Sequence, residues 1–469
     1  MGKFVNSESK IGVSASQAVR LQNAPQKQAM LPLLQADDPS SVVVWRDGAP
    51  IRADVFLAHV HQVRSILPPG ACVVNLCEDR YSFLVAFCAI VLAGQANLLP
   101  PSRARQAVAE VMAAHPGCHA LAETRPCEPP ENFISMPALH AVLDENFVVP
   151  AIPADQLAVI GYTSGSTGQP QANRKTWGSL HASNEGNMAS FAPTLGDTFQ
   201  VVATVPPQHM YGLEMSVLLP LLGDVGVHAG RPFFAADIAR ALSEVPAPRV
   251  LVTTPVHLRA LLAEGVSLPP LAAMVSATAP MPPELAQAAE ARFDAPLLEV
   301  FGSTETCVFA SRRTTTDALW TLYPGVQLHP QPDGTRIEAP QLAAPVILAD
   351  LVELPDPRHF RLCGRNTDLL EIAGKRASLA DLNRRLLSIP GVEDGVMFQL
   401  DQSDAMQVRR IAALVVAPTL SQAELTARLR EMLDPAFLPR PLRRVAALPR
   451  NETGKLPRQA LLAALRDAS

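Results

Sequence analysis

Short apolar segments alternate with helical segments along most of this chain, and this alternation limits the folds that it can adopt. Val73 to Cys77 is typical of a strand, Tyr81 to Gly94 of an apolar helix, and Ala96 to Leu99 of a second strand. A strand, a helix and a strand in that order indicate a βαβ unit. Further strand-like segments occur between helical stretches at 157–162, 200–205, 249–253 and 298–301. The pattern predicts an α/β fold of layered sheets and helices.

The length of the chain and a change of pattern near its end predict two domains. At 469 residues, the chain exceeds what one hydrophobic core usually organises. After Gly364 we expect a charged helix at 379–387 and an apolar strand at 410–416, in a compact α+β unit. We therefore predict a large N-terminal domain over residues 1–364 and a small C-terminal domain over residues 365–469.

Charge, cysteine content and hydropathy narrow the class of protein. A formal net charge of −5 argues against a protein that holds nucleic acid through phosphate contacts. The first ten residues are polar, and the longest apolar run, Phe83 to Gly94, is shorter than the roughly 20 residues of a membrane-spanning helix. Seven cysteines without a CxxC pair indicate reduced thiols. We expect a cytoplasmic protein with no membrane span.

A segment rich in glycine and hydroxyl residues, Gly161 to Gln171, overlaps and follows the strand-like segment 157–162. Glycines let backbone N–H groups turn inward without a Cβ clash, and the hydroxyls add donors, so such a loop can enclose a phosphate. A flexible Ser/Gly loop would explain a few of these residues, but it explains the whole segment less well. The predicted phosphate-binding residues are Thr163, Ser164, Gly165, Ser166, Thr167, Gly168 and Gln171.

Two other motifs are excluded by spacing. A Walker A loop requires GxxxxGK[ST], but Gln169 follows Gly168, so no lysine is placed for the phosphates. A serine hydrolase requires GxSxG, and neither Ser164 nor Ser166 has glycine at both of the required positions.

The segment YTSGSTGQPQ resembles the TSG[ST]TGxPKG signature of the adenylate-forming superfamily, which includes acyl-CoA synthetases, luciferases and the adenylation domains of peptide synthetases. The Lys-Gly of that signature is Gln171-Ala172 here. Either Arg174 or Lys175, just downstream, could replace the missing charge at the phosphate. The resemblance implies the adenylate-forming fold, with a large N-terminal domain and a small, mobile C-terminal domain.

Further segments resemble the blocks of this superfamily in the expected order. QHMYG, from Gln208 to Gly212, is similar to the FHxxG block, which implies that His209 borders the acyl pocket. SATAP, which begins at Ser276, is similar to the SGGAP block that lies along the adenine. The resemblance therefore implies nucleotide contacts at Thr278, Ala279 and Pro280.

FGSTE, from Phe301 to Glu305, resembles the YGxTE block. The resemblance implies a catalytic Thr304 near the α-phosphate and a catalytic Glu305 that helps to hold Mg²⁺. A hard cation accepts oxygen ligands and keeps waters and substrate phosphates, so one protein carboxylate suffices. Phe301, Gly302 and Ser303 are expected to line the nucleotide site.

The last blocks resemble those of the hinge and the catalytic lysine. Asp350 stands in the place of the TGDL aspartate, and Arg365 begins a segment similar to GRxDD; both are implied to contact the ribose. Thr367 replaces a charged hinge residue. RNETGK ends at Lys455, which the resemblance implies is the catalytic lysine.

The resemblance implies an ATP- and Mg²⁺-dependent ligase that converts a carboxylic acid to its acyl-adenylate and transfers the acyl group to a pantetheine thiol of CoA or of an acyl carrier protein. The stretch from His209 to Ser216 contains no aspartate to pair with an amino acid's ammonium group. CEDRYSFLVAF from Cys77, LLPPSR from Leu98, FGSTET from Phe301 and Trp320 resemble ligases of aryl-polyene and xanthomonadin-type pigment pathways, which indicates an aromatic hydroxy-acid. A fatty acyl-CoA synthetase and a catalytically silent nucleotide-binding protein remain as alternatives.

Overall fold

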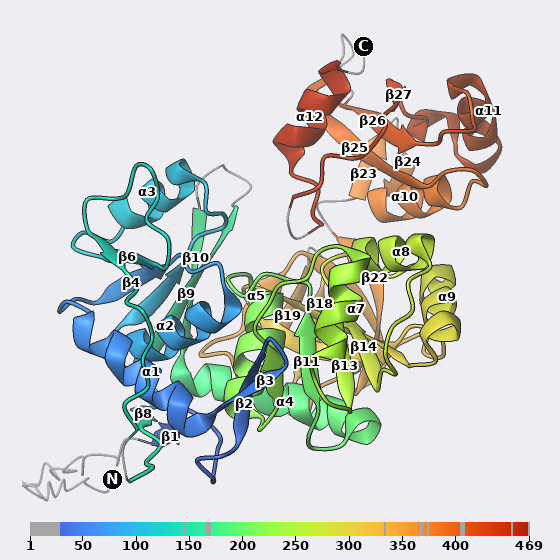
Figure 1. Cartoon of the computed structure of the whole chain (residues 1–469). Helices are drawn as coiled ribbons and strands as arrows, with labels where there is room; N and C mark the ends of the chain where they lie inside the picture. Colours follow the sequence, from blue (N-terminus) through green and yellow to red (C-terminus); the bar gives the residue numbers. More distant parts are fainter. Residues whose placement is uncertain are drawn as a thin grey trace, which may run out of the picture.

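The computed structural model describes residues 29–143, 146–164, 170–332, 334–365, 369–372, 375–403, 409–451 and 454–467. Most of them form a large unit with two extensive sheets, and the residues from Leu369 onward form a smaller unit (Figure 1). The predicted α/β fold is confirmed. Within the described residues, no helix combines the length and the apolar character needed to cross a bilayer.

The first large sheet is built mainly from parallel strands. Its order is β10 (Pro170–Thr176), β9 (Leu157–Ser164), β5 (Ala96–Leu99), β4 (Cys72–Asn75), β6 (His119–Ala122) and β7 (Phe133–Ser135). The only antiparallel pair among these described strands is β9 with β10, which form a hairpin. The strand that precedes the predicted phosphate loop, β9, is therefore parallel to its neighbour β5.

The second large sheet has a parallel centre and antiparallel edges. Its order is β21 (Asp350–Asp356), β22 (His359–Arg365), β17 (Trp320–Leu322), β16 (Cys307–Arg313), β15 (Leu297–Ser303), β14 (Ala273–Ser276), β13 (Arg249–Thr253), β11 (Gln200–Ala203), β12 (Gly226–His228), β2 (Val42–Arg46) and β3 (Ala49–Arg52). The strands from β2 to β15 are parallel. Their carboxyl ends meet at one edge, which is where ligands bind in open α/β sheets.

Helices cover these sheets. They are α1 (Ala53–Ile66), α2 (Arg80–Leu92), α3 (Arg105–Ala113), α4 (Trp177–Leu195), α5 (Met210–Leu213), the π-helix η1 (Glu214–Leu218), α6 (Leu219–Leu222), α7 (Ala235–Ser243), α8 (Pro255–Glu264) and α9 (Pro283–Phe293). Helix α2 is buried on all sides because nearly all of its residues are apolar. Asp79 begins it by accepting a hydrogen bond from the backbone N–H of Ser82.

Small sheets complete the large unit. They are β1 (Met30–Pro32) with β8 (Ala151–Pro153), and β18 (Gln327–Gln331), β19 (Gly334–Glu338) and β20 (Val346–Leu348). The cysteines, all seven of which are described, form no disulfide.

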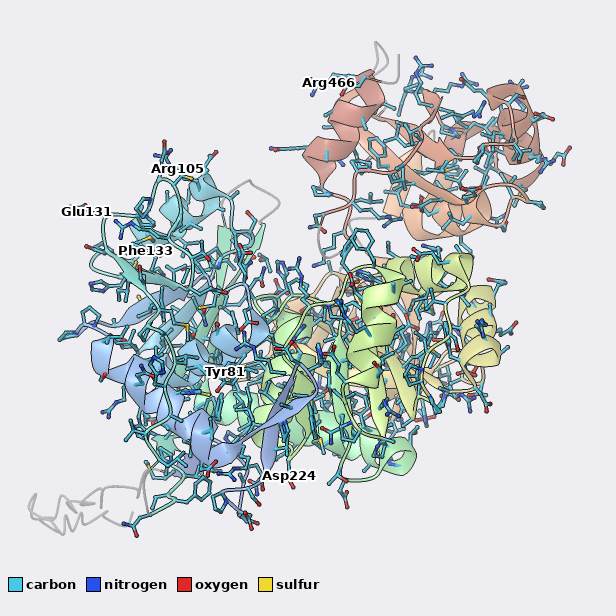
Figure 2. All side chains as sticks on the ribbon, in the orientation of Figure 1. Tyr81, Arg105, Glu131, Phe133, Asp224 and Arg466 are labelled. Carbon is cyan, nitrogen blue, oxygen red and sulfur yellow. The ribbon has the colours of Figure 1, made fainter. Side chains whose placement is uncertain are left out.

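The C-terminal unit has the α+β composition that the sequence predicts. It contains β23 (Leu369–Ile372), β24 (Lys375–Ser378), α10 (Leu379–Leu387), β25 (Asp394–Ser403), β26 (Arg409–Val416), α11 (Gln422–Met432), the 3₁₀ turn η3 (Pro435–Phe437), β27 (Leu442–Arg444) and α12 (Arg458–Asp467). Its buried apolar residues pack in two clusters of their own. It lies over the end of the large unit that carries α5 and α8 (Figure 1), whereas Asp224 lies at the opposite end of the large unit (Figure 2). The domain boundary at residue 365 stays a prediction.

Candidate functional site

The β9–β10 hairpin carries the two ends of the predicted phosphate loop. Thr163 of β9 pairs directly with Gln171 of β10, and Ser164 ends β9. The intervening Gly165, Ser166, Thr167 and Gly168 lie outside the described residues, so their phosphate contacts stay predictions. The hairpin also shows that Gln171 is a strand residue.

Three of the predicted blocks meet beside this hairpin. A Cβ atom on Gly161 would lie 3.3 Å from Thr304 Cγ2 and 3.8 Å from Met210 Cε. Gly161 belongs to the loop segment, Thr304 to FGSTE and Met210 to QHMYG. Because side chains alternate along a strand, Thr163 and its partner Gln171 point to the same side as Gly161. The start of the loop, the acyl-pocket block and the predicted α-phosphate block therefore share one side of β9.

The structure shows what surrounds the two basic residues, Arg174 and Lys175, that could replace the missing lysine. Arg174 pairs with Ile160 and points to the opposite face of the hairpin. Lys175 is only 4% exposed, and its Nζ donates a hydrogen bond to the backbone carbonyl of Glu305, 2.6 Å away. The possibility that either residue contacts the phosphate in place of a lysine at position 171 is therefore not supported.

The turn between β15 and β16 holds Thr304 and Glu305. A side chain at Gly302 would collide with the backbone of Cys307 and Val308, so this close hairpin requires glycine. The Ser303 and Thr306 hydroxyls lie 3.1 Å apart, and the Thr306 hydroxyl also accepts a hydrogen bond from the Ser303 N–H. The shape of the turn therefore requires glycine at position 302 and a hydroxyl residue at position 303. The predicted contacts of Gly302 and Ser303 with the nucleotide stay untested.

Glu305 is the predicted Mg²⁺ ligand. Its side chain is half-buried in the turn, and Lys175 holds its backbone. Within the described residues no group of three or more His, Cys, Asp or Glu side chains could hold a metal ion. One carboxylate fits a cation that keeps water and phosphate ligands, as Mg²⁺ does. The described residues therefore fit Mg²⁺ that is delivered with ATP.

A buried polar network lies beneath this turn. Glu214 is 1% exposed and accepts hydrogen bonds from the Ser183 hydroxyl and from the backbone N–H of Val308, the latter at 3.0 Å. Burial raises the pKa of Glu214, while these hydrogen bonds and then the charge of Lys175 act in the opposite direction. Sequence patterns indicated neither a role for Glu214 nor this role of Lys175. The sequence feature that could have indicated Glu214 is its position as an acidic residue inside the apolar run MYGLEMSVLLPLL.

His209 lies in electropositive surroundings. Burial, followed by the charges of Lys455, Arg103 and Arg231, lowers its pKa to about 4. The imidazole is therefore neutral at ordinary pH, and no acidic side chain is among the groups that shift it. The three cations come from separate segments, and Arg103 also forms an ion pair with Glu78 at 3.4 Å.

The SATAP block begins where β14 ends and contains an unusual backbone. Thr278 has a φ of 76°, in the left-handed region, and its buried Oγ1 has no hydrogen-bond partner among the described residues. The buried Oγ of Ser276 also lacks a described partner. Ala279 is half-buried and Pro280 is exposed. The predicted adenine contacts of this block stay untested.

Phe301 is packed among other aromatic residues. Its ring centroid lies 5.2 Å from that of Trp320, 5.4 Å from that of Phe309 and 5.8 Å from that of Phe360. The ring is half-buried, so only its remaining surface is available to stack on adenine.

The two residues predicted at the ribose lie opposite each other. Asp350 of β21 and Arg365 of β22 are direct partners in the antiparallel pair. Asp350 is 8% exposed, and its backbone carbonyl accepts a hydrogen bond from Thr335. The structure thus places two residues 15 positions apart side by side. Thr367, the predicted hinge residue, lies outside the described residues.

The C-terminal unit brings Lys455 to the large unit. The Lys455 N–H donates to the side chain of Asn451 at 2.9 Å, and the Asn451 N–H donates to the Lys455 carbonyl at 2.8 Å. A Cβ on neighbouring Gly454 would lie 3.6 Å from Val256 of α8. Lys455 is close enough to His209 to lower its pKa. The contact of the predicted catalytic lysine with a substrate stays a prediction.

The sequence is similar to those of several known proteins. The profile of the family described as "AMP-binding enzyme" matches residues 62–337. The chain is 30% identical to 4-coumarate–CoA ligase of Rhodobacter capsulatus over 68% of this chain and 80% of that protein. It is 28% identical to sulfoacetate–CoA ligase of Cupriavidus necator over 70% of this chain and 71% of that protein.

The fold matches solved structures along almost the whole chain. The o-succinylbenzoate CoA synthetase (MenE) of Bacillus subtilis, in complex with the acyl-adenylate OSB-AMP, superposes with a TM-score of 0.75 at 18% identity. The match covers 92% of this chain and 98% of the other.

Proposed function

This chain belongs to the AMP-binding enzyme family, and we propose that it activates an aromatic carboxylic acid as its acyl-adenylate and transfers the acyl group to the thiol of CoA or of an acyl carrier protein. The class of enzyme is an AMP-forming acid–thiol ligase. The nature of the acid and of the thiol acceptor is the part that we propose.

One observation carries the proposal: Thr304 and Met210 both lie beside Gly161, where an added Cβ atom would contact each of them, although the three residues belong to blocks spread over the sequence. A carboxylate is a poor acyl donor until it attacks the α-phosphate of ATP and becomes a mixed anhydride with AMP. That step needs the acid, the phosphates and a counter-charge at one place. Thr304, Glu305 and Lys455 are the residues that we assign to positioning and stabilising the α-phosphate.

The aromatic acid is supported by the 4-coumarate–CoA ligase relative and by the resemblance to ligases of aryl-polyene pathways, and the latter also supports a carrier protein as acceptor. An amino acid is disfavoured. Glu214, the one acidic residue in the stretch from His209 to Ser216, is buried and already bonded to Ser183 and to the Val308 N–H.

A second candidate is a small acid with another anionic group. Arg103, which also pairs with Glu78, and Arg231 contribute positive charge at His209, and the sulfoacetate–CoA ligase relative is consistent with such an acid. Both candidates differ from the fatty acid alternative, which requires an apolar pocket.

Acid-dependent ATP–pyrophosphate exchange tests the proposal. The panel contains benzoates, cinnamates, malonate, sulfoacetate and fatty acids, each with Mg²⁺ and then with EDTA. We expect Mg²⁺-dependent exchange with an aromatic acid, and thioester formation when CoA or a pantetheine-bearing carrier protein is added. Exchange only with fatty acids would replace the proposed substrate class. ATP binding without exchange for any acid would favour the catalytically silent protein.

A further inference from the structure

Thr278 combines two unfavourable features in one residue. Its φ of 76° is uncommon for any residue other than glycine, and for a β-branched side chain it is a genuine outlier. Its buried hydroxyl also has no hydrogen-bond partner among the described residues. Glycine would remove the backbone strain, and valine would remove the unpaired hydroxyl. Residues held in this way cluster at functional sites, so the outlier motivates a functional explanation.

Two further polar atoms without a described partner lie in the adjoining segments. They are Ser276 Oγ, at the end of β14, and Gln208 Oε1, next to His209; the two residues are 1% and 6% exposed. Tyr211 joins these segments, because its hydroxyl donates to the Val275 carbonyl at 2.8 Å. Buried polar groups in native proteins are nearly always paired. Two such hydroxyls, Ser276 and Thr278, therefore lie within three residues at the end of β14, which indicates a place for a polar ligand group.

The electrostatic surroundings favour an oxygen acceptor in that ligand. His209, the residue after Gln208, experiences the positive charges of Lys455, Arg103 and Arg231. The hydroxyls of Ser276 and Thr278 can donate hydrogen bonds. A hydroxyl, carboxylate or sulfonate oxygen suits these neighbours better than an aliphatic chain, which would leave them unpaired.

We propose that Thr278 is a specificity-determining residue that donates a hydrogen bond to a second oxygen-bearing group of the acid, distinct from the carboxylate that becomes the adenylate, and that Ser276 assists it. The inference rests on the proposed acid-activating function. It assigns the substrate class as acids with a polar substituent. Thr278 acts in binding and takes no part in the bond-making step.

Three substitutions separate the possible roles of Thr278. Thr278→Val keeps the shape and the backbone strain and removes only the hydroxyl. Thr278→Ser keeps the hydroxyl, and Thr278→Gly removes both the hydroxyl and the strain. Thr426→Val, on α11 of the C-terminal unit, is a matched control. If strain at position 278 is retained for function, Thr278→Gly should have a higher Tm than the wild type while recognising the acid less well.

The measurement is kcat/KM in acid-dependent pyrophosphate exchange for pairs of acids that differ by one oxygen-bearing group: benzoate with 3-hydroxybenzoate, cinnamate with 4-hydroxycinnamate, and acetate with malonate. We expect the wild type, Thr278→Ser and Thr426→Val to prefer the more oxygenated acid of at least one pair. Thr278→Val and Thr278→Gly should reduce that preference by roughly 3- to 10-fold, as one hydrogen bond allows, with an unchanged KM for ATP.

Two results would overturn the inference while leaving the ligase function intact: an unchanged preference in Thr278→Val, or a raised KM for ATP with an unchanged preference. The second result would assign the hydroxyl to the nucleotide. If no acid supports exchange in the wild type, the proposed function fails and this inference fails with it.

Discussion

Replacing Lys175 by Met tests whether a buried ammonium group organises the predicted catalytic turn. The side chain is 4% exposed, and its Nζ lies 2.6 Å from the carbonyl oxygen of Glu305. Met fills a similar volume without the charge, so the change removes the interaction and leaves little cavity. A hydrogen bond with a charged donor contributes about 1.5–3 kcal/mol, and the buried carboxylate of Glu214 also loses a favourable charge. We expect a total destabilisation of about 2–4 kcal/mol.

Urea unfolding followed by tryptophan fluorescence measures this loss. The tryptophans, Trp45, Trp177 and Trp320, all precede residue 365, so the signal reports on the large unit. Arg174→Met is the matched control, because Arg174 is the exposed neighbour on the opposite face of β10. The control should change the free energy of unfolding by less than about 0.5 kcal/mol. Pyrophosphate exchange should fall in Lys175→Met and stay near the wild-type rate in the control.

A double-mutant cycle with Glu214→Gln isolates the electrostatic coupling. No direct contact joins the two side chains, but Lys175 acts on the pKa of Glu214. We expect the double variant to be more stable than the sum of the single changes by about 1 kcal/mol. Additive changes, or a Lys175→Met variant as stable as the control, would falsify this account of the turn.

Three other predictions concern the remaining parts of the site. Lys455→Ala should lower pyrophosphate exchange roughly 10²- to 10³-fold, as the loss of one electrostatic donor does, and normal exchange would remove Lys455 from the catalytic role. Thr367→Pro should spare exchange and block thioester formation, whereas equal loss of both steps would contradict a hinge at that residue. Burial, then Lys455, Arg103 and Arg231, lowers the pKa of His209 to about 4 from an ordinary value of 6.5. Between these pH values the unfolded chain binds a proton that the folded chain does not, so stability should fall as pH decreases from 6.5 to 4. His209→Gln should flatten that fall in urea midpoints, and an unchanged slope would show that another group controls it.

Much of the fold could be predicted from short stretches of sequence. The predicted segments 96–99 and 249–253 coincide with β5 and β13, and the predicted helix at 379–387 coincides with α10. These predictions succeed because the period of apolar residues and the burial of a strand or helix face are local properties. The order of the blocks likewise identified the segments that meet around Thr304.

The sequence alone determined the α/β class, the family resemblance and the residue types available for phosphate and acid chemistry. Only the tertiary structure decided what several of those residues contact. From its position in the sequence, Lys175 is a candidate phosphate ligand. In the structure it donates a hydrogen bond to the backbone carbonyl of Glu305, which is 130 residues away in the sequence. The sequence SATAP likewise indicates neither the backbone strain of Thr278 nor the lack of a hydrogen-bond partner for its hydroxyl among the described residues. Such features depend on the path of the backbone and on packing between distant segments, and no local pattern of residues specifies either.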